Sequence, residues 1–143
     1  MNTINQIQDS IIDEFSMFED WLDRYSLIID MGQQLPEPSA TLLDDKNLID
    51  GCQSKVWIDA EMRDGLVHYT AFSDALLIKG IVAMLLRVLN DRTPEDILTS
   101  DLYLIDRIGL HQHLSPNRSN GLSAMLRQMR DYAKVFQAKQ MAE

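Results

Sequence analysis

The sequence predicts an α+β fold in which one small antiparallel sheet packs against about five or six helices. Two features carry this prediction. Asp64-Gly65 is a two-residue hairpin signal that joins two strand-like runs, and together these span about 55–73. Apolar residues recur at helical spacing on both sides of this hairpin. The chain has 143 residues, which suits a single domain, and we expect that domain to span 1–143.

The hairpin signal also determines which residues face one another. With Asp64-Gly65 as the turn, Arg63 pairs with Leu66 and the pairing continues outward to the ends of both strands. One face of the sheet is then apolar, and the other is polar near the turn. Trp57 and Phe72 form an aromatic pair at the far end, where they either support the preceding loop or fill a secondary core. A one-residue slip would mix polar and apolar side chains on both faces, so we expect this register.

Two helices are predicted before the hairpin. Thr3 can cap a first helix that ends near Phe15. Ser16 and Glu19 match the Ser-x-x-Glu capping box, so a second helix is expected from there to Gly32. The second helix has one apolar face, which we assign to core packing: Phe18, Trp21, Leu22, Tyr25, Ile28 and Ile29.

The segment between the second helix and the hairpin is predicted to be mostly irregular. Two prolines in Leu35-Pro36-Glu37-Pro38-Ser39 exclude a helix there. A short edge strand is predicted near 47–50. The polar loop around this strand leads to Gly51-Cys52, directly before the hairpin.

The helices after the hairpin begin at recognisable capping residues. Ser73-Asp74 is expected to cap a central helix from Ala75 to about Asn90, with the Asp74 charge complementing the positive helix end. The middle of this helix is apolar on all sides, and Gly80 would let another element approach closely. Three more helices are predicted, with these bounds: about 94–98 after Thr93, 102–108 after Asp101, and 116 to about 138 after Ser115.

Composition excludes several classes of function. The formal net charge of −9 would repel a phosphate backbone, so nucleic-acid binding is not expected. The acidity is compatible with a partner that carries a basic patch, although solubility explains it equally well. The single cysteine rules out an internal disulfide. No apolar run approaches the ~18 residues of a membrane span, and the N-terminus is unlike a signal peptide, so we expect a cytoplasmic protein without a membrane partner.

The single cysteine, Cys52, has an unusual setting for a buried residue. It lies between Gly51 and the polar run Gln53-Ser54, which is typical of a loop tip that feeds a strand. Lys55 would favour the thiolate form electrostatically. A lone cysteine can equally be a small buried hydrophobe, and the polar neighbours are the argument against that interpretation.

Metal and cofactor chemistry are poorly supported. The sequence has no Cys-x-x-Cys, and His111 with His113 supplies only two ligands beside Cys52, so neither a metal nor a cofactor is expected. One alternative is a Cys–His hydrolase, with Cys52 as nucleophile and His113 or His68 as base. The hairpin register places His68 near the turn and away from Cys52. Sulfur relay needs only one cysteine, because a thiolate that attacks the outer sulfur of a persulfide becomes a persulfide itself.

Several blocks of the chain together resemble one known family, the SufE sulfur-acceptor proteins, which work with cysteine desulfurases in iron–sulfur cluster assembly. The resemblance covers nearly the whole chain and is carried by the following residues: Gly51-Cys52-Gln53-Ser54-Lys55-Val56-Trp57, Ser73-Asp74-Ala75, Lys79-Gly80, Thr93-Pro94, and His113-Leu114-Ser115-Pro116-Asn117-Arg118-Ser119-Asn120-Gly121-Leu122. The chain departs from many relatives at Ala71-Phe72, so the Trp57–Phe72 pair is expected to be particular to it.

The resemblance implies both a fold and a site. It implies an α+β fold like that of the IscU-type scaffold, with the reactive loop against an apolar hollow. Cys52 would accept persulfide sulfur from a SufS-type cysteine desulfurase and pass it to the SufB component of a scaffold complex. Arg118 would stabilise the thiolate or persulfide anion, and Asp74 would support the loop or the start of its helix. The competing interpretations are that Arg118 pairs with an acid in the first turn and that Asp74 is only a helix cap.

We therefore interpret the chain as a sulfur-transfer accessory protein that stimulates desulfurase turnover, rather than as an enzyme acting on a free small molecule. Two alternatives remain at this stage. One is the cysteine hydrolase that uses Cys52 and His113, and the other is a docking adaptor that activates the desulfurase without carrying sulfur. The sequence leaves the oligomeric state open, including a homodimer.

Overall fold

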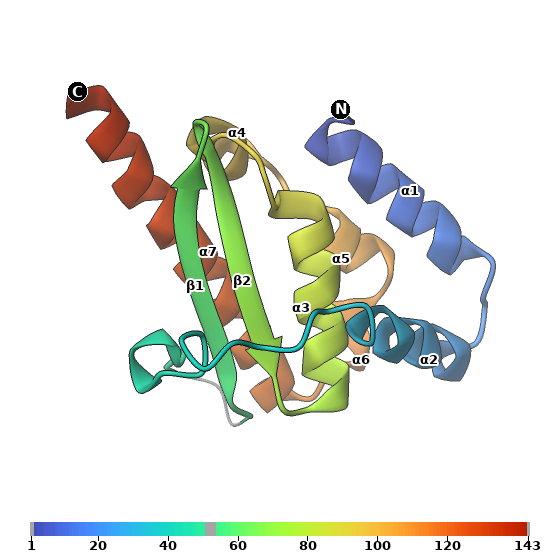
Figure 1. Ribbon diagram of the computed structural model, residues 1–143. Coiled ribbons are helices and arrows are strands. Elements are labelled where there is room, and N and C mark those ends of the chain that lie inside the picture. The colour runs from blue at the N-terminus through green and yellow to red at the C-terminus, as the bar shows by residue number, and fades with distance from the viewer. Residues whose placement is uncertain (1, 51–53, 143) are drawn as a thin grey trace.

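The computed structural model describes residues 2–50 and 54–142. The predictions made for Gly51, Cys52 and Gln53 therefore lie outside the described residues. Within them, seven α-helices and one two-stranded antiparallel sheet confirm the α+β fold (Figure 1). The helices and strands have these bounds: α1 Ile4–Ser16, α2 Trp21–Gly32, β1 Val56–Arg63, β2 Leu66–Ser73, α3 Leu76–Leu89, α4 Pro94–Thr99, α5 Leu104–Arg107, α6 Leu110–His113 and α7 Pro116–Ala142.

The predicted hairpin register is confirmed at every pair from Arg63–Leu66 to Val56–Ser73. Asp64 and Gly65 both have positive φ angles, of 53° and 80°, which is the backbone conformation that a type I′ turn requires. The apolar face is buried except at Ala60 and Met62, which are half-buried, and the other face is polar near the turn. A slip by one residue would expose that apolar face, so burial of the core selects this register.

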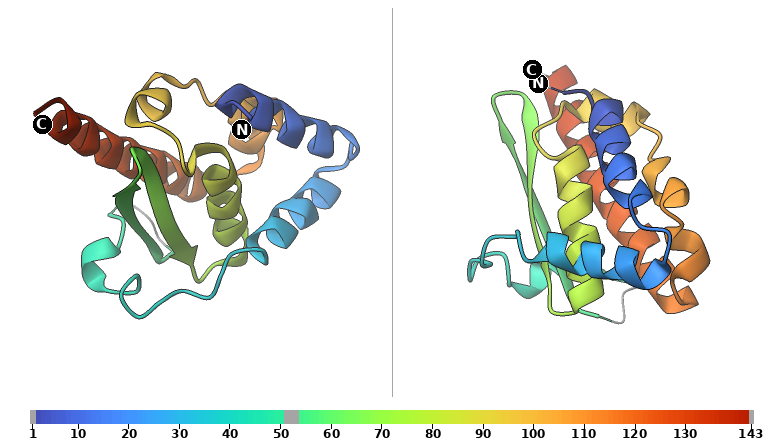
Figure 2. Two further views of the ribbon diagram at one scale, coloured as in Figure 1. Left: turned by 45° about the horizontal axis from the view of Figure 1, so that its top comes forward. Right: turned by 90° about the vertical axis from the view of Figure 1, so that its right-hand side faces the viewer.

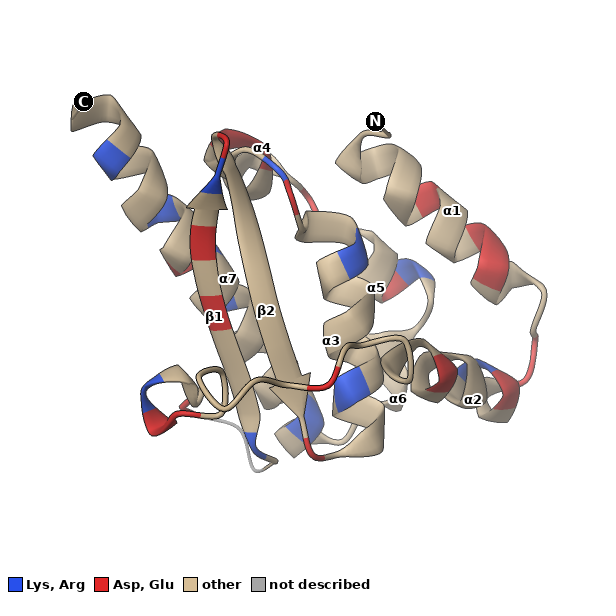
Figure 3. Cartoon of the chain, viewed as in Figure 1, with Lys and Arg blue, Asp and Glu red and all other residues tan. Residues whose placement is uncertain are grey.

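The helices gather on one side of the sheet. Figure 2 shows α3 and α7 against one face, with α1 and α5 in a further layer behind α3. The part of the chain that follows α2, up to residue 50, crosses the opposite side near the strand ends, as Figure 1 also shows. The charged residues do not gather on one face in Figure 3, where acidic residues are spread over α1, α2, β1 and α4. This distribution agrees with acidity that serves solubility.

Tyr69 links the sheet to α7. The residue is 1% exposed and its hydroxyl donates a hydrogen bond of 2.6 Å to the carbonyl oxygen of Met129. Burial raises the pKa of Tyr69, because an ionised phenol would lose its hydration in the core.

We expect Tyr69→Phe to lower the free energy of unfolding by about 1 kcal/mol at neutral pH, through the loss of this buried hydrogen bond. The raised pKa of Tyr69 also makes the stability of the fold depend on pH in a definite direction. The unfolded chain ionises this tyrosine first, so stability falls as the pH rises above about 10, and the phenylalanine variant lacks that contribution. Urea unfolding at neutral and alkaline pH measures both effects. If Tyr69→Phe had the same unfolding free energy as the native chain at neutral pH, the predicted contribution of the hydrogen bond would be contradicted.

Helices α2 and α3 pack with their backbones in direct contact. A Cβ atom on Gly80 would lie 2.0 Å from the carbonyl oxygen of Ile28, and one on Gly32 would lie 2.8 Å from the Gly80 nitrogen. Only hydrogen at both positions permits this approach. The prediction that Gly80 admits another element is thus confirmed, and the element is α2.

The predicted start of the second helix was wrong. Helix α1 continues to Ser16, whose hydroxyl donates to the carbonyl oxygen of Asp13 and so does not cap a new helix. Helix α2 begins later, at Trp21, where the carboxylate of Asp20 accepts the amide hydrogen of Leu22. Asp20, rather than the predicted Ser16, therefore caps α2. By contrast, Thr3 forms the predicted cap, within a complete capping box with Gln6.

The central helix starts one residue later than predicted. The N-cap position of α3 is Ala75, which makes no side-chain capping hydrogen bond, so neither Ser73 nor Asp74 occupies it. The Ser73 hydroxyl still accepts the Ala75 amide hydrogen at 3.2 Å, and it donates to the carbonyl oxygen of Lys55 at 2.9 Å. Ser73 thereby ties the start of α3 to the residue that precedes β1.

The edge strand predicted near 47–50 reduces to a single bridge. Asp45–Asn47 forms a turn of 3₁₀ helix, and among the described residues that follow it, up to residue 50, Leu48 forms a single bridge to Trp57 of β1. The amide of Ile49 donates to the carbonyl oxygen of Val56 at 2.9 Å. One edge of β1 is thus covered at the end nearest the described Ser54.

The helix predicted for 102–108 is shorter, spanning Leu104–Arg107, and the hydrogen bond at its start comes from another helix. Asp101 does not cap it. Instead, the buried side chain of Gln8 in α1 accepts the amide hydrogen of Leu104 at 3.2 Å and donates to the carbonyl oxygen of Asp101 at 3.0 Å. Gly109 then turns the chain with a φ angle of 82°, and the four-residue α6 follows. This extra turn accounts for seven helices where about six were expected.

Candidate functional site

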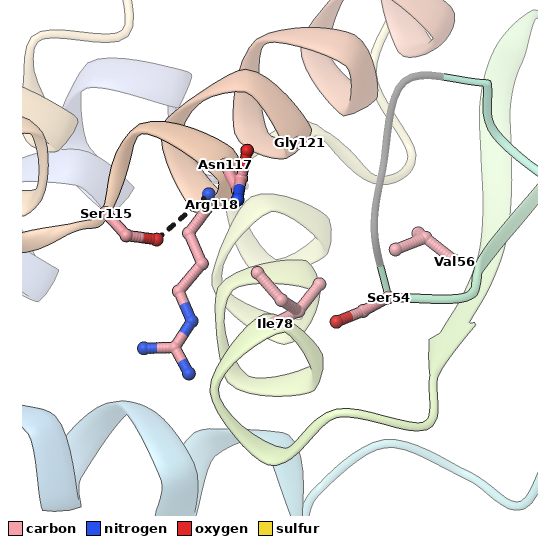
Figure 4. Close-up of a pocket in the computed structure, with 7 residues that line it drawn as sticks. All are labelled: Ser54, Val56, Ile78, Ser115, Asn117, Arg118 and Gly121. Carbon is pink, nitrogen blue, oxygen red and sulfur yellow. Dashed lines mark hydrogen bonds between the residues drawn. The ribbon is translucent and has the colours of Figure 1, made fainter.

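A cavity of about 420 Å³ lies where the start of β1, helix α3 and the first turns of α7 meet (Figure 4). Its lining residues are Ser54, Val56, Ile78, Ser115, Asn117, Arg118 and Gly121. Ser54 is the first described residue after the segment that contains Cys52. The cavity therefore borders the stretch of chain that the sequence singled out for chemistry.

The two sides of this cavity differ in character. Val56 from β1 and Ile78 from α3 are both almost completely buried and provide an apolar wall. The opposite side is the N-terminus of α7, which carries the positive end of a 27-residue helix dipole. An anionic group that entered here would meet a positive field on one side and a low-polarity wall on the other.

The start of α7 is built as the sequence predicted. Pro116 occupies the first helical position. The hydroxyl of Ser115 accepts the amide hydrogen of Arg118 at 3.3 Å, and its carbonyl oxygen accepts the amide hydrogen of Ser119 at 2.9 Å. This cap orients the first turn of the helix, from which Asn117 and Arg118 reach the cavity.

Arg118 lines the cavity and has no acidic partner among the described residues. The competing interpretation from sequence was an ion pair with an acid, but no carboxylate in residues 2–50 or 54–142 forms a salt bridge with it. Its guanidinium Nη1 instead donates to the hydroxyl of Tyr25 in α2, at 3.0 Å. Figure 4 shows the side chain extending from the start of α7 toward α2. A neutral partner leaves the charge available to an anion.

Asp74 does not line this cavity. It is exposed in the connection between β2 and α3, near the positive end of that helix. Its predicted role as support for the reactive loop stays a prediction.

Trp57 and Phe72 form the predicted aromatic pair. Their ring centroids are 6.3 Å apart, and Lys79 Nζ lies 5.1 Å from the Phe72 centroid. Trp57 also carries the bridge to Leu48. These contacts join the end of the hairpin to its surroundings, while the proposed support of the cysteine loop stays a prediction.

His68 lies in β2, whereas His111 and His113 both lie in α6. His68 contacts Asp91 at 2.8 Å beside β2, and His111 lies 3.6 Å from Asp106. His113 stacks on Trp21 with ring centroids 4.1 Å apart, and its Nδ1 lies 2.9 Å from the carbonyl oxygen of Gly109. None of the three lines the cavity.

No group of three His, Cys, Asp or Glu side chains in 2–50 and 54–142 is arranged to hold a metal ion. No helix in the same ranges combines the length and the apolar character needed to cross a membrane.

Sequence reasoning missed several residues of this site. Asn117 and Gly121 stood within the block that carries the family resemblance, but neither was given a role. Tyr25 was assigned to core packing because it follows the apolar spacing of α2. The structure confirms that it packs against the core, and adds that its hydroxyl reaches Arg118.

The fold has a clear counterpart among solved structures. The solution structure of a hypothetical protein from Thermus thermophilus superposes with a TM-score of 0.76, covering 92% of this chain and 96% of that one. At 19% sequence identity this likeness establishes the fold alone. The class of protein is thus an α+β domain with a cavity beside its hairpin.

Sequence comparison gives the family. The family model named SufE, described as an Fe-S metabolism associated domain, matches residues 9–133. An uncharacterized SufE-like protein of Rhizobium meliloti is 36% identical over 133 residues, covering 88% of this chain and 94% of its relative. A second, from Rhizobium etli, is 34% identical and covers 89% of each chain. The chain belongs to the SufE family, which is associated with iron–sulfur metabolism.

Proposed function

We propose that this protein accepts persulfide sulfur on Cys52 from a SufS-type cysteine desulfurase and passes it to a SufB-containing scaffold complex. By discharging the desulfurase it would speed turnover of that enzyme. The protein would act in the cytoplasm beside these partners, and it would need no resident metal or cofactor of its own.

The observation that carries the proposal is the place of the cavity. Ser54 lines it and follows Cys52 by two residues, and two trans peptide units span at most about 7.6 Å. The same cavity receives Arg118, whose charge no described carboxylate neutralises. A thiolate or persulfide anion within reach of that guanidinium would be favoured over its protonated form.

The reaction is an exchange between sulfur atoms and needs no external oxidant. The Cys52 thiolate attacks the outer sulfur of the desulfurase persulfide, and a new S–S bond forms on Cys52. The original S–S bond breaks, and its electron pair leaves with the desulfurase cysteine as a thiolate. A second exchange of the same kind would hand the sulfur to a thiol of the scaffold.

The decisive experiment is the mass of the protein after mixing with a cysteine desulfurase and free cysteine. We expect an increase of one sulfur atom that maps to Cys52 and is reversed by a thiol reductant. The Cys52→Ser chain serves as the control and should gain no mass. Stimulation of the desulfurase without any sulfur on Cys52 would favour the docking adaptor and contradict the relay.

The hydrolase alternative predicts a different response at His113. We expect His113→Phe, which keeps an aromatic ring against Trp21, to retain desulfurase stimulation within about two-fold of the native chain. A general base would be indispensable to a Cys–His hydrolase, so its loss should remove nearly all activity. Turnover assays with the native and variant chains at equal concentration separate the two outcomes.

A further inference from the structure

The Arg118 side chain at the cavity needs a contact with another residue to hold it in one rotamer. Arg118 is exposed, and an arginine side chain of this kind is free to adopt many rotamers, at a cost of up to ~2 kcal/mol when it is held in one. Its side chain has one hydrogen bond to another described residue, from Nη1 to the Tyr25 hydroxyl at 3.0 Å. The two residues are 93 positions apart in the chain, so this contact exists only in the folded protein.

Helix α2 holds the start of α7 at two points. Trp21 and Tyr25 lie about one helical turn apart, with their rings edge to face at a centroid distance of 6.3 Å. Trp21 stacks on His113 before the Ser115-Pro116 cap, and Tyr25 bonds Arg118 after it. One face of α2 therefore contacts the chain on both sides of the turn that opens α7.

Helix α2 is itself fixed to the wall of the cavity. The contact of Gly80 with the Ile28 backbone leaves no space for even one methyl group between α2 and α3. Helix α3 supplies Ile78 to the cavity. The Tyr25 hydroxyl is thus held at a defined place relative to that wall before any ligand arrives, as preorganisation requires.

We propose that Tyr25 is a positioning residue for Arg118. Its hydroxyl accepts one of the five guanidinium N–H groups and holds the charge beside the cavity, leaving the other donors for a sulfur anion. Tyr25 does not touch the reacting atoms in this scheme. The inference rests on the proposed function, since the anion is the thiolate or persulfide of Cys52.

The test compares Tyr25→Phe, Arg118→Ala and the double variant. Tyr25→Phe keeps the ring against Trp21 and removes only the hydroxyl. We expect it to slow sulfur transfer from the desulfurase to Cys52 roughly five-fold, the effect of one hydrogen bond. The double variant should be no slower than Arg118→Ala alone, because the hydroxyl acts only through the guanidinium. Tyr103→Phe is the matched control, since its hydroxyl bonds Asn5 and Asp9 of α1 instead.

A second readout uses the isolated protein. The rate of Cys52 alkylation by iodoacetamide, followed against pH, reports the thiolate fraction. Tyr25→Phe should move the midpoint to higher pH, because a less ordered guanidinium stabilises the thiolate less, whereas Tyr103→Phe should not move it. An unmoved profile together with an unchanged transfer rate overturns the inference, as does a double variant whose loss is the product of the single losses. If the native chain takes no sulfur at all, the proposed function fails, and the alkylation profile still decides the role of Tyr25.

Discussion

Cys52→Ser is expected to reduce the desulfurase rate to that of the desulfurase alone. A serine hydroxyl is not ionised near neutral pH and does not form a persulfide, so neither of the two sulfur exchanges can occur. The substitution changes one atom and leaves the residues that line the cavity in place. Turnover is measured as alanine or sulfide produced from free cysteine, with and without equal amounts of each chain.

A mixing experiment separates loss of chemistry from loss of folding. A folded Cys52→Ser chain keeps the surface that docks on the desulfurase, so in excess it should suppress the stimulation given by the native chain. A misfolded chain would leave that stimulation unchanged. If instead the serine chain stimulates as well as the native one, the protein carries no sulfur and the adaptor interpretation replaces the relay.

The hairpin was the most predictable part of the fold, and the reason is local. Asp64-Gly65 supplies a turn whose two positive φ angles suit these residues, and the alternation along both strands leaves a single register that buries one face. Thr3 and Thr93 could likewise be predicted from local sequence. At each helix start the threonine hydroxyl accepts the amide hydrogen of the residue three positions later.

The errors arose where a distant residue takes over a local function. Asp101 looked like a helix cap, but Gln8 of α1 provides the hydrogen bond to Leu104 from 96 positions away. Ser16 looked like another cap, yet its hydroxyl was already used by the preceding turn. A pattern of neighbouring residues carries no information about partners that only the folded chain brings close.

In the candidate site, too, local sequence signals could be predicted, whereas contacts between residues distant in the chain could not. Arg118 could be singled out because it stands in a recognisable block, but its partner could not. Tyr25 follows the apolar spacing of α2, and this pattern predicts only that its ring packs against the core. It does not predict that its hydroxyl bonds Arg118. The cavity as a whole joins three segments, at Ser54, Ile78 and the start of α7, which no local pattern connects.

Gly80→Ala is expected to lower the free energy of unfolding by about 3 kcal/mol, despite the better helix propensity of alanine. Considered locally, the change should stabilise α3 by up to ~1 kcal/mol. In the folded chain the new methyl group would lie 2.0 Å from the Ile28 carbonyl oxygen, and both groups belong to backbones that cannot rotate away. The sign of the measured effect therefore shows whether the contact of α2 with α3 dominates.

Gly65→Ala is the matched control for this change. It also replaces a glycine by alanine, but no atom lies within 4 Å of the added methyl group, so only the strain of a positive φ angle remains, about 1 kcal/mol. Urea unfolding followed by circular dichroism compares the two variants. Because α2 carries Tyr25, a displaced α2 would also loosen Arg118, so folded Gly80→Ala should transfer sulfur more slowly, whereas Gly65→Ala should not. A Gly80→Ala chain as stable as the native one would show that the two helices can separate without cost, and would remove the rigid base on which Tyr25 depends.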